Sequence, residues 1–338
     1  MKDLGTIPTD PDILGRDGGY SAVFQGYSVW LYGDTFVAAP NAKDFSLISD
    51  SWSYTRDLNA PSGITGFQQP MDSTGAPSML LPETPAEQAF SAAHNGNDCQ
   101  QRPCGARWAL WPASVVTDPA SGHALVFYSL VAAQPGNFNL QAVGNSVATW
   151  LNLQQQPQLP TINPPMVTGH PDLLFGENEP NFGSAALLSG GMLYVYGCGL
   201  PSSGTDKGCR LGRVSPESAA DRSAWTFYSG NGDWSAQDGD AVSVFTGANI
   251  LTVAWNSYLQ QYVAVHSATF SNNVMMRTAT SPEGPWSSEI AYDALAHREY
   301  EQNGGQVIYV TYSRSTGAFS SEMRLVAITL EAFTGKSQ

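Results

Sequence analysis

Short apolar stretches, bounded by turn-forming residues, recur along the chain in pairs. The first pair covers residues 20–25 and 28–35 on either side of a Gln25-Gly26-Tyr27 turn, which predicts a β-hairpin. Four further pairs follow, at residues 107–116 and 123–131, 182–188 and 192–198, 249–255 and 261–267, and 305–313 and 322–330. No segment of a dozen residues shows convincing helical periodicity. The pattern therefore predicts an all-β protein.

The hairpins recur at intervals of about 50 to 90 residues, and most carry a further strand-like segment, which predicts a repeated small sheet. Five such units favour a five-bladed β-propeller, formed as a single domain by residues 1–338. The alternative is a β-sandwich, whose strands would follow one another more evenly and without a recurring hairpin. Residues 57–105 are predicted to be mostly loop. The first and last segments are the candidates for closing the ring.

Charge narrows the range of partners. The chain of 338 residues has a formal net charge of −14, with 13% charged and 11% aromatic residues. Nucleic acid and anionic membrane surfaces both require an excess of Lys and Arg, so neither is expected as a partner. Neutral ligands such as glycans remain, and we expect a monomer.

Four cysteines form two local couples, Cys99 with Cys104 and Cys198 with Cys209, both in loop-like segments. Two short-range disulfides are the favoured interpretation, which predicts a secreted or periplasmic protein. A four-thiolate zinc site or free thiols are the alternatives, although the spacing of the second couple is too wide for the usual zinc motif.

Two aspartates mark the ends of the first hairpin. Asp17 precedes its first strand and Asp34 closes its second, so antiparallel pairing places them side by side at one edge. Paired carboxylates are what glycoside hydrolysis requires. Arg16 is expected to keep one of the two ionised by lowering its pKa. The alternative is that each aspartate only satisfies backbone N–H groups in its turn.

Acids, amides and aromatic residues also precede or begin the first strand of the other units. Propeller ligands bind at the mouth of the central channel, and carboxylates, amides and tryptophan faces are typical of a sugar site. Glu179 is the reserve acid, and the stretch 299–303 is expected at the same mouth. The expected substrate-binding residues are Arg16, Trp111, Asn178, Asn181, Asn249 and Trp255. The alternatives are solvated loop charge for Glu179 and core or inter-blade packing for the tryptophans.

No cofactor is predicted. The five histidines lack metal-ligand spacing such as HExxH, so none is assigned a role, and no phosphate-binding glycine loop is present. Calcium occurs in the channel of such propellers, but the sequence shows no ligand set for it.

The segment GRDGGYSAVFQGYSVWLYGDTF at residues 15–36 resembles the opening signature of a large bacterial family long described as a domain of unknown function. Some members of that family are classed as glycoside hydrolase family 183, endo-D-arabinanases. Weaker matches are TRDLNAPSGITGF at 55–67, SPEGPWS at 281–287 and NGGQVIYVTYSR at 303–314. The resemblance implies a five-bladed propeller whose catalytic acids are Asp17 and Asp34.

A more distant resemblance is to the family 43 arabinanase and fructosidase propellers. It implies an aspartate base on the first strand and a glutamate acid in a later blade, here Asp17 and Glu179. The sequence thus favours a glycoside hydrolase acting on a furanose-containing polysaccharide or oligosaccharide, an arabinan. A non-catalytic, lectin-like glycan-binding propeller is the alternative. A polysaccharide lyase is disfavoured, because the acidic chain has no basic cluster for a uronate.

Overall fold

Five antiparallel sheets are arranged around a ring as a five-bladed β-propeller in the computed structural model, which confirms the predicted fold. The structure describes residues 1–39, 46–136, 139–199, 208–267, 274–288, 290–291, 295–317 and 320–331. Among these residues, no helix is both long enough and apolar enough to cross a membrane.

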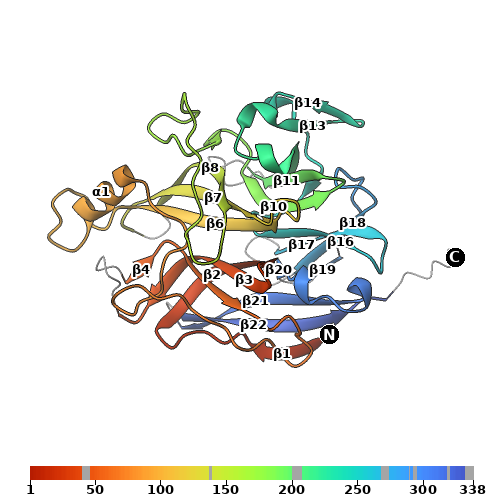
Figure 1. Cartoon of the computed structure of the whole chain (residues 1–338), viewed down its shortest axis with the longest axis horizontal. Helices are drawn as coiled ribbons and strands as arrows, with labels where there is room; N and C mark the ends of the chain where they lie inside the picture. The colour runs from red at the N-terminus through yellow and green to blue at the C-terminus, as the bar shows by residue number, and fades with distance from the viewer. Residues whose placement is uncertain are drawn as a thin grey trace.

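Each blade begins with an inner strand that faces the ring axis (Figure 1), and the chain then moves outward. The inner strands are β2 (Ile13–Phe24), β6 (Arg107–Thr117), β10 (Phe182–Ser189), β16 (Leu251–Asn256) and β20 (Leu295–Ala296). The second strands are β3 (Tyr27–Val37), β7 (Ala124–Ala133), β11 (Met192–Cys198), β17 (Gln261–Ser267) and β21 (Val307–Gly317). The third strands are β5 (Ser51–Thr55) with the short β4 (Leu47–Ile48) beside it, β8 (Leu140–Trp150), β12 (Gly208–Val214), β18 (Val274–Ala279) and β22 (Ser320–Thr329).

Shorter strands complete the outer edges, and the first of them closes the ring. β1 (Lys2–Thr6) pairs antiparallel with β22, so the two ends of the propeller, which were the candidates for closing the ring, share one blade. The others are β9 (Phe175–Gly176), β13 (Thr226–Gly230), β14 (Asp233–Ser235), β15 (Phe245–Thr246) and β19 (Ile290–Ala291). Single-turn 3-10 helices are η1 (Pro216–Ser218), η2 (Arg222–Ala224), η3 (Asp238–Asp240), η4 (Arg298–Tyr300) and η5 (Asn303–Gly305).

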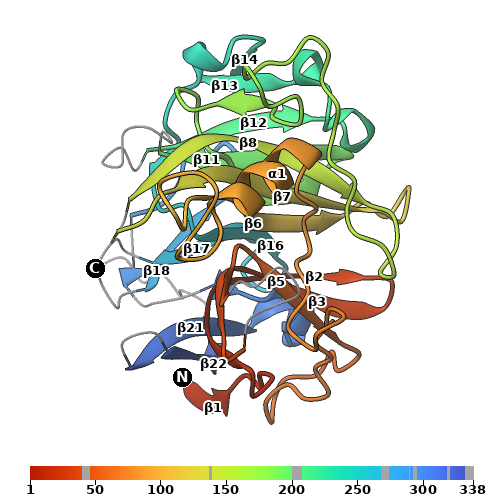
Figure 2. The same ribbon diagram turned by 90° about the vertical axis from the view of Figure 1, so that its left-hand side faces the viewer.

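One α-helix, α1 (Pro85–His94), interrupts the segment predicted to be mostly loop, and it lies against the blade of β6, β7 and β8 (Figure 2). Its start is specified locally. Thr84 accepts a hydrogen bond from the backbone N–H of Glu87, the Glu87 side chain accepts one from the N–H of Thr84, and Pro85 occupies the first turn. This capping box is visible in the sequence as TPAE, but a helix of 10 residues is too short to show helical periodicity over a dozen residues.

The core consists of apolar clusters between neighbouring blades rather than one central body. Trp150, Trp225 and Trp30 are fully buried at three of these contacts. Burying a side chain such as Phe182 contributes roughly 1.5–3 kcal/mol relative to leaving it exposed. The blades are thereby held in a fixed angular order, which positions the inner-strand ends relative to one another.

Both predicted disulfides are present, Cys99–Cys104 and Cys198–Cys209. The second also joins directly paired residues of β11 and β12. Because the entropic effect of a disulfide grows with the loop it closes, we expect the double variant Cys198→Ser, Cys209→Ser to lower the free energy of unfolding by about 2–4 kcal/mol. The matched variant Cys99→Ser, Cys104→Ser removes a disulfide that closes a shorter loop, so its free energy of unfolding should fall by less. Denaturant unfolding measures both variants. A larger loss from the shorter loop would contradict this order.

Candidate active site

A β-bulge brings the two predicted aspartates together. In the β2–β3 hairpin, Arg16 pairs with Thr35 and Gly18 pairs with Tyr32, so Asp17 faces two residues of β3, Gly33 and Asp34. Bulges of this kind re-aim side chains, often next to active sites. A methyl group built on Gly33 would lie 3.9 Å from the Cβ atom of Asp17.

Glycine is required on the other side of the bulge. Gly18 and Gly19 have φ angles of +86° and +117°, a region that other residues adopt only with strain. The RDGG sequence therefore encodes the local backbone that presents Asp17.

Asp34 is held by the neighbouring blade. Its carboxylate accepts hydrogen bonds from the guanidinium of Arg107 at 2.9 and 3.1 Å and from the indole N–H of Trp111 at 2.9 Å. Both donors are on β6. Charge-assisted hydrogen bonds of this type are short and directional, so they hold the Asp34 side chain in one orientation.

Asp17 has a different environment. Its side chain is exposed to solvent, and no side chain donates a hydrogen bond to it among the described residues. The pKa of Asp17 is raised, because surrounding protein atoms displace part of its hydration and because the negative charge of Asp34 is near. The two carboxyls thus differ in their surroundings, since only Asp34 accepts side-chain hydrogen bonds.

The expected role of Arg16 as partner of an aspartate is not what the structure shows. Arg16 is only 6% exposed, its guanidinium lies 3.4 Å from the ring centre of Tyr32, and it donates a hydrogen bond to Gln69 at 3.1 Å. Successive strand residues point to opposite faces, so Arg16 is directed away from the side that carries Asp17. Arg107 makes the ion pair instead.

Glu179 belongs to a tight turn before β10. Its carboxylate accepts a hydrogen bond from the backbone N–H of Gly176 at 2.6 Å and forms an ion pair with Arg222 at 3.1 Å, and Arg222 also binds Asp238. Glu179 lines a cleft of about 470 Å³ together with Asn178 and His170. This cleft does not include Asp17 or Asp34, so Glu179 stands apart from the aspartate pair.

The remaining predicted substrate residues are dispersed. Asn181 accepts a hydrogen bond from Ser129 at 3.0 Å, and Asn249 is exposed just before β16. Trp255 lies at the far end of β16 from Asn249 and packs edge-on against Tyr262, with ring centres 5.0 Å apart. Tyr262 lies on β17 of the same blade, and Trp255 also packs against an apolar cluster that includes residues of the third blade, as in the packing alternative.

The stretch 299–303 is also not at the mouth as expected. The inner strand of the fifth blade is the short β20, so these residues follow an inner strand instead of preceding one. Glu299 is half-buried, and the loss of hydration raises its pKa; it accepts hydrogen bonds from Ser21 at 2.5 Å and Ser28 at 2.9 Å. It lines a channel cavity of about 360 Å³ along the second halves of the inner strands, whose lining does not include Asp17 or Asp34.

Two further acidic groups were not singled out from the sequence. Asp50 is fully buried behind the hairpin, where burial raises its pKa to about 8, and it anchors the chain by accepting the backbone N–H of Leu80. A second group, Glu87 with His170 and Asp172, is the one cluster among the described residues whose ligand atoms could hold a metal ion. No sequence spacing links Glu87 to the other two, so only the HPD order at 170–172 could have drawn notice.

Comparisons with known proteins agree with this architecture. No curated protein sequence matches the chain. A candidate hydrolase from Bacteroides ovatus ATCC 8483 is 11% identical over 95% of this chain and 86% of that chain, with a TM-score of 0.60. Zg3597, a family 117 glycoside hydrolase from Zobellia galactanivorans, is 10% identical over 96% and 89%, with a TM-score of 0.54. The GH43_1 enzyme from Xanthomonas citri, solved with xylotriose, is 12% identical over 94% and 88%, with a TM-score of 0.52.

At such low identities, the comparison shows only that these structures share the fold of this chain. The family model gives the more specific match. Residues 140–315, more than half of the chain, match the model described as a domain of unknown function, DUF4185. The protein therefore belongs to the DUF4185 family.

Proposed function

We propose that this protein is a glycoside hydrolase that cleaves a furanose-containing polysaccharide, an arabinan, with Asp17 and Asp34 as its catalytic acids. The observation that carries the proposal is the contrast between two adjacent carboxyls. Asp34 accepts hydrogen bonds from Arg107 and Trp111, whereas Asp17 has no side-chain donor and its pKa is raised. Two carboxyls whose environments push their protonation apart are what divides the acid and base roles in glycoside hydrolysis.

The chemistry follows from this difference. Asp17 donates its proton to the glycosidic oxygen as the bond to the anomeric carbon breaks. Asp34 acts from the opposite side, either by attacking the anomeric carbon or by taking a proton from the attacking water. In the first case a covalent glycosyl-enzyme forms and Asp17 then activates the water; in the second, configuration is inverted in a single step.

The substrate class has separate support. The sequence of the first hairpin resembles the endo-D-arabinanases, and the solved structures that share the fold include a family 117 glycoside hydrolase and a GH43_1 enzyme complexed with xylotriose. A net charge of −14 favours a neutral glycan over an acidic one. The two disulfides are in keeping with an oxidising compartment outside the cytoplasm.

The test is a screen of plant and mycobacterial cell-wall polysaccharides, with release of reducing ends and the mass of the products as readouts. D-arabinan or L-arabinan is expected to yield arabinose oligosaccharides. Calorimetric binding of the same glycans with no product would instead assign a lectin, and release from galactan or xylan alone would overturn the arabinan assignment.

The pH profile should report Asp17. Because its raised pKa keeps the proton on Asp17 to higher pH than on an ordinary aspartate, kcat/KM is expected to fall on the alkaline side as this proton is lost. In the variant Asp17→Asn, the residual rate should lose this alkaline limb while the acidic limb remains. The measurement is the pH dependence of kcat/KM for both proteins; an unchanged alkaline limb in the variant would assign the acid to another group.

A further inference from the structure

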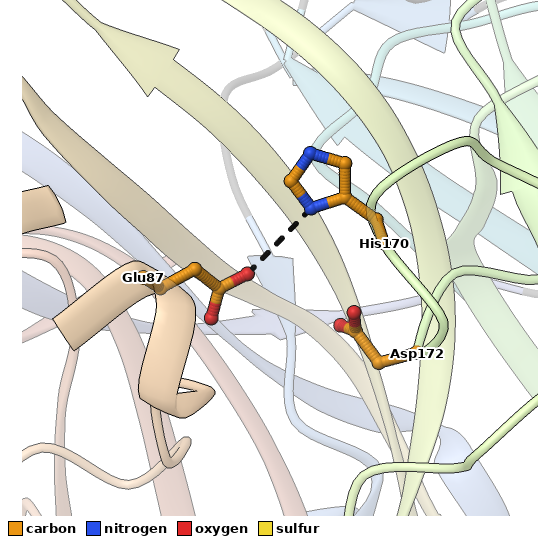
Figure 3. A group of neighbouring side chains, drawn as sticks. All are labelled: Glu87, His170 and Asp172. Carbon is orange, nitrogen blue, oxygen red and sulfur yellow. Dashed lines mark ion pairs between the residues drawn. The ribbon is translucent and has the colours of Figure 1, made fainter. Parts of the chain in front are cut away.

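Three side chains from distant parts of the chain converge beside the blade of β6 to β9. Glu87 comes from α1, and His170 and Asp172 come from the segment between β8 and β9 (Figure 3). One ligand atom from each lies within 4.8 Å of the other two, and the Oε1 atom of Glu87 is 3.9 Å from Nδ1 of His170. Figure 3 shows the two carboxylates and the imidazole directed toward a common point.

Both carboxylates are deeply buried and only half satisfied. Glu87 is 1% exposed and Asp172 is 2% exposed. One oxygen of each has a partner: Glu87 accepts the N–H of Thr84 at 2.8 Å, and Asp172 accepts the hydroxyl of Tyr128 at 2.9 Å. The other oxygens, Oε1 of Glu87 and Oδ1 of Asp172, face the cluster without any hydrogen bond.

No Lys or Arg of the described residues forms an ion pair with either carboxylate. Buried carboxylates are normally paired with a cation or bound to a metal, because an isolated buried charge is strongly unfavourable. The missing group is therefore a cation, or a proton on one of the carboxyls.

We propose that Glu87, His170 and Asp172 form a binding site for a divalent metal ion of the zinc class, which fastens α1 to the propeller. An imidazole nitrogen with two carboxylate oxygens is a donor set that zinc accepts, whereas calcium prefers six or more oxygen ligands. His170 also lines the cleft of about 470 Å³ near Glu179, which provides a route for the ion. Glu87 belongs to α1, whereas His170 and Asp172 belong to the segment between β8 and β9, so the ion would hold these two segments together.

Two substitutions separate metal binding from folding. In Glu87→Gln, glutamine can still close the capping box with Thr84, so α1 keeps its N-terminal cap while the site loses a charged ligand. Asp172→Asn keeps an acceptor for Tyr128. The control is Glu83→Gln, which changes a buried carboxyl next to α1 that accepts a hydrogen bond from Ser91 and is outside the cluster.

The experiment uses the full chain, stripped with chelator and titrated with zinc chloride, with manganese and calcium chloride in parallel. Bound metal is measured by elemental analysis after dialysis, and Tm is measured with and without each ion. We expect one zinc ion per chain and a Tm that rises with zinc, with affinity lower by about 100-fold in Glu87→Gln and Asp172→Asn and unchanged in Glu83→Gln. Absence of zinc binding by the unaltered chain, or equal binding by both site variants, would overturn the site. A Tm of Asp172→Asn at or above that of the unaltered chain, with no response to metal in either, would show that a proton fills this role.

Discussion

Replacing Asp17 or Asp34 by asparagine is expected to lower kcat on an arabinan by about 100- to 10,000-fold, the usual contribution of a positioned acid or base. KM should change little, because asparagine keeps the size and polarity of each side chain. The control is Asp118→Asn. Asp118 lies in the turn after β6 and accepts a hydrogen bond from the backbone N–H of Ala120, which the side-chain oxygen of asparagine can also accept. Full activity in both Asp17→Asn and Asp34→Asn, with unchanged Tm, would end the assignment of the pair.

The same two variants should fail in different ways. A substrate with a good leaving group, such as a nitrophenyl arabinofuranoside, needs no proton from Asp17, so Asp17→Asn should recover much of its rate on it. Asp34→Asn should not recover, because the attack on the anomeric carbon is what it lacks. Recovery of Asp34→Asn in place of Asp17→Asn would exchange the two roles while keeping the pair.

Arg107→Met is expected to lower kcat/KM by roughly 10- to 100-fold, since a hydrogen bond to a charged group is worth about 1.5–3 kcal/mol. Without Arg107, Asp34 loses two of the three hydrogen bonds that orient its carboxylate. Arg107→Lys should restore part of the rate, because the charge returns without the forked geometry.

The matched control is Arg314→Met, which removes a more exposed arginine that pairs with Glu322 at the edge of the last blade. Exposed pairs contribute little, so this variant should retain its rate and most of its stability. An unchanged kcat/KM in Arg107→Met would show that catalysis does not depend on the orientation that Arg107 gives Asp34.

The strands and their hairpins were determined locally. Alternating apolar stretches around turns such as Gln25-Gly26 define β2 with β3, and the same signal recurs in four later units, so both the all-β class and the number of blades could be read from the sequence. The aspartate pair was also local, because Asp17 and Asp34 belong to one hairpin and its glycines encode the bulge. The disulfides were readable for the same reason, since each joins cysteines that are close in the sequence.

Other features depend on contacts between segments that are far apart in the chain. Arg107 reaches Asp34 from the next blade, although Arg16 is adjacent to Asp17 in sequence, because strand alternation directs Arg16 to the opposite face. The inner strand of the fifth blade is the two-residue β20, which is too short to leave a periodic signal. Residues 299–303 therefore follow this inner strand, although the sequence predicted that they precede one.

The pairing of β1 with β22 and the approach of Glu87 to His170 and Asp172 likewise have no local signature. Hydrophobic periodicity and turn-forming residues are properties of short segments, so the sequence alone determined the hairpins, the blade count and the acidic pair. The partners of Asp34 and the buried three-residue cluster were decided only when tertiary packing brought remote side chains within a few ångströms of one another.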